Sequence, residues 1–149
     1  MLRVLLAASL LVAAGLSACD SKPEVATAPP PSKSMARPAQ MYAGQEQIVS
    51  VTSAAVRRDA TGALSMTATG ATASPGYVNL GFLRRINAAA PRDGIYEMDV
   101  VGDRPSTPTA EAVTPVEVKG AWEGYPAERL KGVKFITKTN SVVVMLPPA

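Results

Sequence analysis

The side chains best placed for metal or acid–base chemistry form one acidic group. Asp93, Glu97, Asp99 and Asp103 fall within eleven residues, and Glu97 and Asp99 alternate along one expected strand, so they share a face. Carboxylates in such a group suit a hard cation such as calcium, or a carboxylate-based enzyme. Their spacing is not that of a calcium-binding helix–loop–helix motif, and alternating carboxylates are typical of a solvated strand face. We therefore expect Glu97 and Asp99 to point outward into water and predict no metal and no cofactor.

Other catalytic classes are restricted by composition. The chain of 149 residues contains no histidine, which excludes Ser–His and Cys–His catalysis and histidine metal sites. Neither G-x-S-x-G nor S-x-x-K occurs, so no serine nucleophile is indicated. The net charge of +3 is mild and evenly spread, which argues against nucleic acid as a partner. The sequence predicts a protein that is not an enzyme.

One thiol remains, Cys19, and with a single cysteine no internal disulfide forms. The chain before it begins with the short basic stretch Met1–Arg3 and continues with the apolar run Val4–Gly15. That run is shorter than the roughly 20 residues that span a bilayer. A basic start, a short apolar run and small residues before a cleavage point are typical of a secretory signal peptide.

The four residues that end at this cysteine, Leu16-Ser17-Ala18-Cys19, resemble the lipobox of bacterial lipoproteins. The resemblance covers the first twenty residues. It implies that the sulfur of Cys19 receives a diacylglyceryl group, that the signal peptide (residues 1–18) is cut between Ala18 and Cys19, and that the new amine is acylated, with chains such as palmitate. Two or three acyl chains anchor a protein stably, whereas one chain binds a membrane only marginally. An ordinary signal peptide that contains a cysteine, or an uncleaved membrane anchor, are the alternatives.

The residue after Cys19 bears on which membrane holds the protein. Asp20 at this position resembles the sorting signal that keeps some lipoproteins in the inner membrane, so we expect the inner rather than the outer membrane, with the protein facing the periplasm. Residues 19–44 are rich in Pro, Ala, Ser and Lys and include Pro29-Pro30-Pro31. Such a composition predicts a disordered, semi-rigid tether between the lipid and the rest of the chain.

Residues 45–149 carry the patterns of an all-β domain. Leu64, Met66 and Ala68 alternate with polar residues, which indicates a half-buried strand and, with the residues before it, a hairpin over residues 46–70. Similar stretches at 77–86, 95–101, 112–122, 133–139 and 142–146 bring the total to about seven strands, with one short helical turn at residues 125–132. We predict an antiparallel β-sandwich, with an immunoglobulin-like arrangement or a small barrel as its candidate forms.

Within this domain, some side-chain environments are also predicted. We expect Val78, Leu80, Phe82 and Ile86 to share a face, Trp122 and Phe135 to lie in the core, and Tyr125 to be exposed. The all-apolar run Val142–Leu146 should be covered on both faces. One member of each arginine pair, Arg57-Arg58 and Arg84-Arg85, should point inward or extend along apolar surface.

These features lead to a functional hypothesis. We expect a lipid-anchored cell-envelope protein whose β-domain is a non-catalytic accessory or interaction module, with another envelope protein or peptidoglycan as its partner. An exposed sheet edge suits recruitment of a partner strand. A small-ligand-binding or protease-inhibitor-like sandwich, using the loop around residues 102–111, is the second hypothesis. A carboxylate enzyme or cation-binding protein is the third.

Overall fold

The computed structural model of this chain describes residues 34–107 and 109–147. The predicted signal peptide and the predicted roles of Ala18, Cys19 and Asp20 lie outside the described residues. No helix in the described part of the chain has the length and hydropathy needed to cross a membrane.

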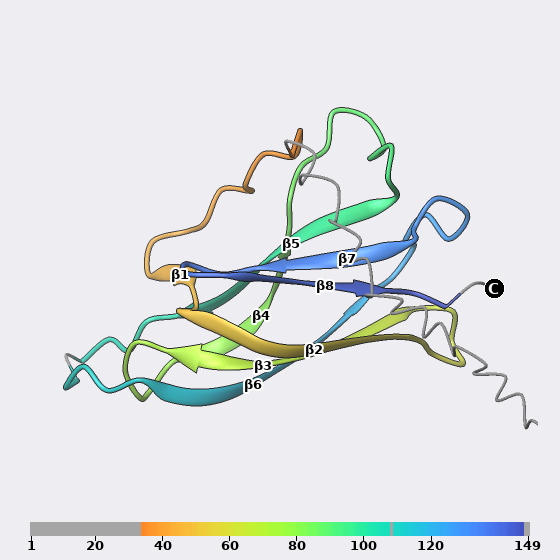
Figure 1. Cartoon of the computed structure of the whole chain (residues 1–149). Helices are drawn as coiled ribbons and strands as arrows, with labels where there is room; N and C mark the ends of the chain where they lie inside the picture. The colour runs from red at the N-terminus through yellow and green to blue at the C-terminus, as the bar shows by residue number, and fades with distance from the viewer. Residues whose placement is uncertain (1–33, 108, 148–149) are drawn as a thin grey trace, which may run out of the picture. The chain divides into compact units, whose positions relative to one another are not determined.

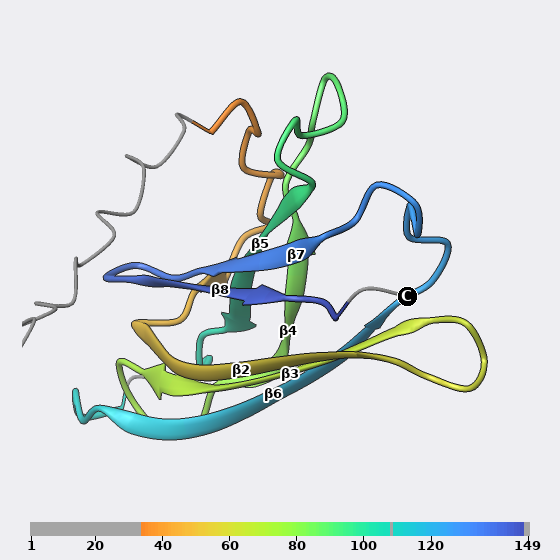
Figure 2. The same cartoon turned by 45° about the vertical axis from the view of Figure 1, so that its right-hand side comes forward.

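Eight strands form two sheets that pack face to face (Figure 1). The strands are β1 Gln45–Gln47, β2 Ser50–Arg58, β3 Leu64–Thr72, β4 Val78–Arg84, β5 Ile95–Asp103, β6 Thr114–Trp122, β7 Gly132–Ile136 and β8 Ser141–Met145. One sheet has the order β2-β3-β6. The other joins β4, β5, β7 and β8 (Figure 2). The short β1 pairs with the C-terminal end of β5, where Gln45 lies opposite Asp103. The prediction of an all-β sandwich is confirmed, with one strand more than expected because β1 is separate from β2.

The prediction that all strands pair in antiparallel fashion is wrong for one pair of strands. β5 and β7 pair in parallel, with Ile95 opposite Gly132 and Asp99 opposite Ile136. The physical reason lies in the connection. Because the chain crosses to the other sheet to form β6 before it returns as β7, no tight turn links β5 to β7, and a parallel pairing becomes accessible.

The predicted hairpin over residues 46–70 is present, with β2 and β3 paired from Arg58 and Leu64 outward. β7 and β8 form a second hairpin around the turn at Asn140. The first turn is closed by the Asp59 carboxylate, which accepts hydrogen bonds from the backbone N–H groups of Thr61 and Ala63 (both 2.9 Å). Asp59 therefore shapes a turn, as its neighbours in the sequence indicate.

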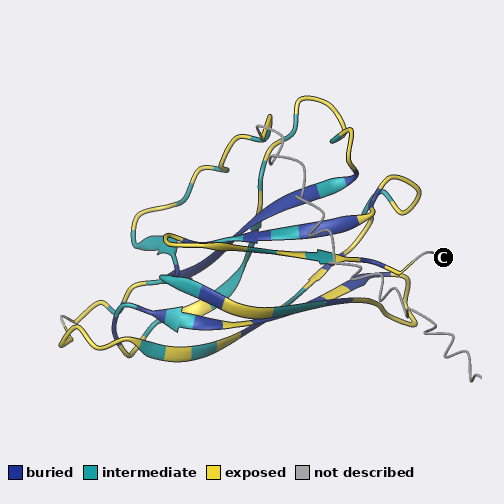
Figure 3. Cartoon of the chain, in the orientation of Figure 1, coloured by how far each residue is buried: buried dark blue, intermediate teal, exposed yellow. Residues whose placement is uncertain are grey.

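The core lies between the sheets and consists of alternate residues from both (Figure 3). Leu64, Met66 and Ala68 are buried as predicted, and so are Trp122 and Phe135. Tyr125 is half-buried rather than exposed, because its ring packs against Trp122 with the centroids 6.2 Å apart. Tyr96 also packs against Trp122, with the centroids 5.5 Å apart, so Trp122 joins two tyrosines in the core.

Two predictions about apolar strands are wrong. β8 is covered on one face only, since Val143 and Met145 are about half exposed. β8 is the last strand of its sheet, and no layer of described residues covers its outer face. Val78 in β4 is also about half exposed, because a bulge with Asn79 at φ 49° interrupts the alternation of buried and exposed residues. Ile86 is about half exposed because it lies beyond the end of β4.

The predicted helical turn is a single closed turn rather than a helix. The carbonyl of Pro126 accepts hydrogen bonds from the N–H groups of Arg129 and Leu130 (both 2.9 Å), and Leu130 is buried in the core. Gly132 then begins β7, so the chain has no room for a second turn.

Residues 34–44, here called the N-terminal arm, lie against the larger sheet instead of forming a free spacer. Arg37 and Ile86 exchange two backbone hydrogen bonds of 2.9 and 2.8 Å. The Tyr42 hydroxyl donates to the Asp103 carboxylate (2.5 Å). Within the segment predicted as a tether, the part from Ser34 onward is therefore attached to the sandwich.

Candidate functional site

A groove opens where the outer edges of the two sheets meet, between β4 and β6. It has a volume of about 380 Å³. Its floor consists of Met66, Phe82, Met98 and Trp122, of which the methionines and the tryptophan are less than a tenth exposed. The groove thus reaches the core through an apolar floor and is bounded by two strands that do not pair with each other.

One wall of the groove is the free edge of β4. The N–H of Arg85 donates to the Glu97 carbonyl (3.0 Å), which sets the alternation of bonds between β4 and β5. In an antiparallel pair this alternation turns the backbone groups of Phe82 and Arg84 away from β5 and toward the groove. The next residue with this orientation, Ile86, is the one that pairs with the N-terminal arm.

The opposite wall is the free edge of β6. The N–H of Asp59 donates to the Ala63 carbonyl (2.9 Å), and this bond fixes the alternation along β3 and, through the register of β3 with β6, along β6. It turns the backbone groups of Lys119 and Ala121 toward the groove. Pro115 has the same orientation, and a proline without an N–H is tolerated in a sheet at such an edge.

Small residues keep the groove open. A Cβ at Gly120 would lie 2.8 Å from the Phe82 ring, so the two strands approach closely there only because Gly120 has no side chain. Gly81 has open space where its side chain would be. Since Phe82 lies beside Gly120 and Arg84 beside Trp122, the two strands run in the same direction along the groove.

The charged groups at the groove are both cations. The guanidinium carbon of Arg84 lies 5.3 Å from the Trp122 ring centroid, within range of a cation–π interaction. Lys119 lies 3.1 Å from Glu117, and both side chains are more than half exposed. Among the described residues Arg84 has no carboxylate partner within 4.0 Å. The groove therefore has an apolar floor and a positive rim.

The acidic group of the sequence analysis is placed differently from the expectation. Glu97 and Asp99 do share a face, but they are buried, 8% and 0% exposed. Arg85 binds the Asp99 carboxylate through two nitrogens, at 2.9 and 3.1 Å, and the amide of Gln47 donates to it at 2.6 Å. The expected solvated face is instead covered by the N-terminal arm and β1, so Asp99 is an ion-paired, hydrogen-bonded group.

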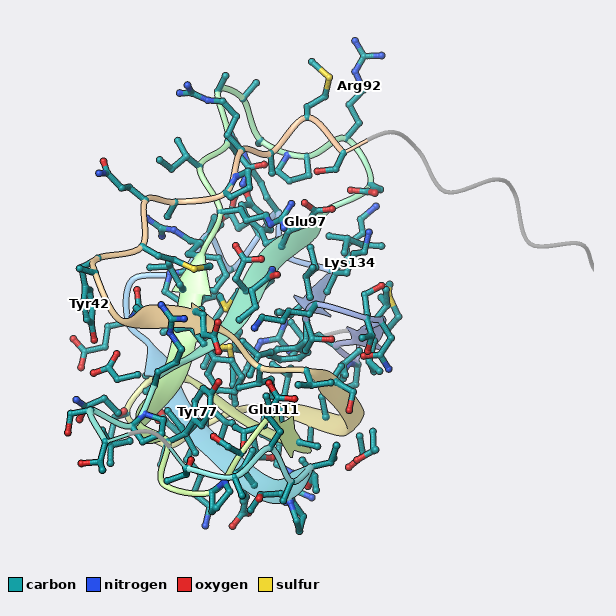
Figure 4. All side chains as sticks on the ribbon, turned by 90° about the vertical axis from the view of Figure 1, so that its left-hand side faces the viewer. Tyr42, Tyr77, Arg92, Glu97, Glu111 and Lys134 are labelled. Atoms are coloured by element: carbon teal, nitrogen blue, oxygen red, sulfur yellow. The ribbon has the colours of Figure 1, made fainter. Side chains whose placement is uncertain are left out.

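Glu97 belongs to the same covered face. Its carboxylate accepts a hydrogen bond from the Ser34 hydroxyl (2.5 Å) and lies 3.5 Å from the Lys134 ammonium group on the adjacent strand (Figure 4). A shallow polar depression of about 360 Å³ opens beside it, toward the β7–β8 turn. These carboxylates are already matched by cations, which leaves little free charge for an added metal ion.

The remaining two members of the group are separate from this pair. Asp93 accepts a hydrogen bond from the Ile95 N–H (3.0 Å) in the turn before β5. Asp103 accepts from Tyr42 and from the Asn79 amide (2.5 and 2.7 Å), and these hydrogen bonds lower its pKa. In the described ranges, 34–107 and 109–147, no three His, Cys, Asp or Glu side chains are grouped so as to hold a metal ion.

A second charged cluster joins β1 to the loops at one end of the sandwich. Burial raises the pKa of Glu46, but hydrogen bonds from Lys138 and Tyr77 and the charges of Lys138 and Arg104 outweigh it and hold the pKa below its usual value. Burial, and then the hydrogen bond to Glu46, raise the pKa of Tyr77 to about 12. These groups fasten β1 to its neighbours and do not line the groove.

The arginine pairs show one success and one failure. Arg84 and Arg85 point to opposite faces of β4, as predicted, the first over Trp122 and the second to Asp99. Arg57 and Arg58 are both exposed, and the Arg58 guanidinium donates to the Pro147 carbonyl (3.3 Å). The sequence analysis missed the groove. The signal that could have found it is Gly120, inside an otherwise regular strand, since such a glycine marks a site of close approach.

Comparisons with known proteins found no matching family model, no matching curated protein and no matching solved structure.

Proposed function

We propose that this protein is a lipid-anchored component of a bacterial cell envelope, and that its β-sandwich is a non-catalytic interaction module held beside a membrane. The observation that carries the proposal is the stretch Leu16-Ser17-Ala18-Cys19 after a short apolar run, with Cys19 as the only cysteine. A thiol at this place suits thioether formation with a lipid, and acyl chains gain roughly 0.8 kcal/mol per buried methylene.

The sandwich supports the interaction part of the proposal. The groove between β4 and β6 presents unpaired backbone groups on both walls, which is the arrangement that binds extended segments of other proteins. The buried carboxylates, by contrast, are occupied by Arg85 and Lys134. The geometry thus favours recognition over a carboxylate-based reaction.

Anchoring is tested by metabolic labelling with a palmitate analogue in a bacterial host. The native chain should incorporate label and sediment with membranes. Cys19→Ala should lose both properties, whereas Ser21→Ala, two residues away, should retain them. Equal labelling of Cys19→Ala would contradict the proposal, because another site would then carry the lipid.

The membrane location of the protein is tested in the same cells by separating the inner and outer membranes. The native chain, with Asp20, should be enriched in the inner membrane, and Asp20→Ser should shift toward the outer membrane. Native protein recovered mainly from the outer membrane would contradict the inner-membrane part of the proposal and leave the anchor unaffected.

A further inference from the structure

We infer that the groove between β4 and β6 binds an extended, acidic segment of a partner protein, which adds to the free sheet edge as a strand. This inference rests on the proposed role as an interaction module and names the chemistry of its partner. It does not depend on the lipid anchor.

Backbone chemistry selects an extended segment. Phe82 and Arg84 on one wall, and Lys119 and Ala121 on the other, turn N–H and C=O groups toward the groove in the alternating pattern of a free strand edge. Because β4 and β6 approach closely at Phe82 and Gly120, an added segment pairs with one of these edges and not with both. An extended chain satisfies such groups, which a helix cannot do because its own backbone groups are already paired.

The β4 edge already accepts such a partner within the chain itself. Just past Arg84, the backbone of Ile86 exchanges two hydrogen bonds with Arg37 of the N-terminal arm. The arm does not continue along Arg84 and Phe82, since β4 has no further pairing there in the described residues. The free edge at the groove therefore continues an edge that pairs with the N-terminal arm at Ile86.

Other strand edges are less accessible. β8 is tied to β2 at both ends, where the Asn140 side chain exchanges two hydrogen bonds with the Val51 backbone and Arg58 reaches Pro147. The first half of the β6 edge contains Pro115, which offers no N–H group. This restricts strand addition to the second half of β6 and the facing part of β4, where the groove lies.

Side chains select an acidic and partly apolar segment. In an extended chain alternate side chains share a face, so one set would meet the apolar floor at Phe82 and Trp122. The rim supplies Arg84 and Lys119 and no carboxylate. The exposed pair of Lys119 with Glu117 is weak and can be exchanged for a partner's carboxylate. Charge complementarity therefore indicates Asp or Glu in the partner segment.

The test uses Trp122, the only tryptophan of the chain, as a reporter inside the groove. Full-length, processed protein in detergent is titrated with the peptide acetyl-TVEVEVT-amide and with its basic counterpart acetyl-TVKVKVT-amide. Neither peptide is aromatic, so emission reports on the protein alone. The acidic peptide should change Trp122 emission, shield it from acrylamide and bind about tenfold more tightly than the basic one.

Charge reversal makes the test specific. Arg84→Glu with Lys119→Glu should invert the preference, and Lys119→Glu alone, which keeps Arg84 over Trp122, should already reduce it. Arg57→Glu with Arg58→Glu reverses two exposed cations on β2 and should leave the preference unchanged. Circular dichroism establishes that each variant is folded.

Two outcomes would overturn the inference: no response of Trp122 to the acidic peptide at millimolar concentration, or the same preference in the charge-reversed and native proteins. Loss of palmitate labelling would refute the anchor without changing these titrations, so the two failures are distinguishable.

Discussion

The guanidinium of Arg84 covers the ring of Trp122, with 5.3 Å between the guanidinium carbon and the ring centroid. This contact lies at the groove between β4 and β6 and places a positive charge beside the aromatic cluster of Trp122, Tyr96 and Tyr125. A cation over an indole is stabilised by the ring's negative face.

Replacing Arg84 should uncover the indole. Arg84→Ala should destabilise the fold by about 0.5–1 kcal/mol, because the cation–π contact is lost. Trp122 emission should shift to the red and acrylamide quenching should increase. Arg57→Ala, an exposed arginine elsewhere, is the control and should change neither. Unaltered quenching in Arg84→Ala would mean that Arg84 does not cover the ring in solution.

Removing a buried carboxylate should be far more costly. Asp99→Ala leaves Arg85 without its main partner at a fully buried position and should destabilise the protein by about 3–5 kcal/mol in urea unfolding. Glu117→Ala removes an exposed pair and should cost less than about 1 kcal/mol. Similar losses for the two variants would show that Asp99 is solvated.

Acid should weaken the contribution of Glu46. Because the folded state lowers the pKa of Glu46, its ionised form adds stability above the ordinary pKa, and this stability is lost as the pH falls through the lowered value. The stability gap between the native protein and Glu46→Gln should therefore shrink as the pH falls below about 4.5, when followed by urea unfolding at several pH values. A gap that stays constant with pH would refute the role of the charge.

Alkali should act on Tyr77 in the opposite sense. Its folded pKa of about 12 exceeds the ordinary value of 10.0, so the protonated phenol stabilises the fold below pH 10 and this contribution is lost as the pH rises through about 12. Tyrosinate absorbance of the native protein should show a step near pH 12, and Tyr77→Phe should lack it. A titration curve of Tyr77→Phe that retains this step would assign it to another tyrosine.

The sequence predicts which residues of a single strand share a face, but it does not predict which other segment of the chain packs over that face. Leu64, Met66 and Ala68 are buried as their period of two indicates, because that pattern is local. Glu97 and Asp99 obey the same period, but their burial depends on Arg85 and on an arm that begins some sixty residues earlier in the chain. No local pattern encodes which segment will cover a strand face.

The sequence does not predict which strands lie at the edge of a sheet, for a similar reason. The run Val142–Leu146 has the composition of a central strand, yet β8 has only one paired neighbour and exposes Val143. Strand order follows from how the whole chain packs, and it also creates the groove, which needs β4 and β6 from different sheets to meet. In the sequence, only Gly120 indicates that the two strands meet.

The most direct test of the central claim is the intact mass of the processed protein purified from bacterial membranes. We predict a chain that starts at Cys19, lacks residues 1–18 and carries the added mass of a diacylglyceryl group on that residue, with one more acyl chain where the amine is modified. A mature chain with an unmodified Cys19, recovered from the soluble periplasmic fraction, would contradict it.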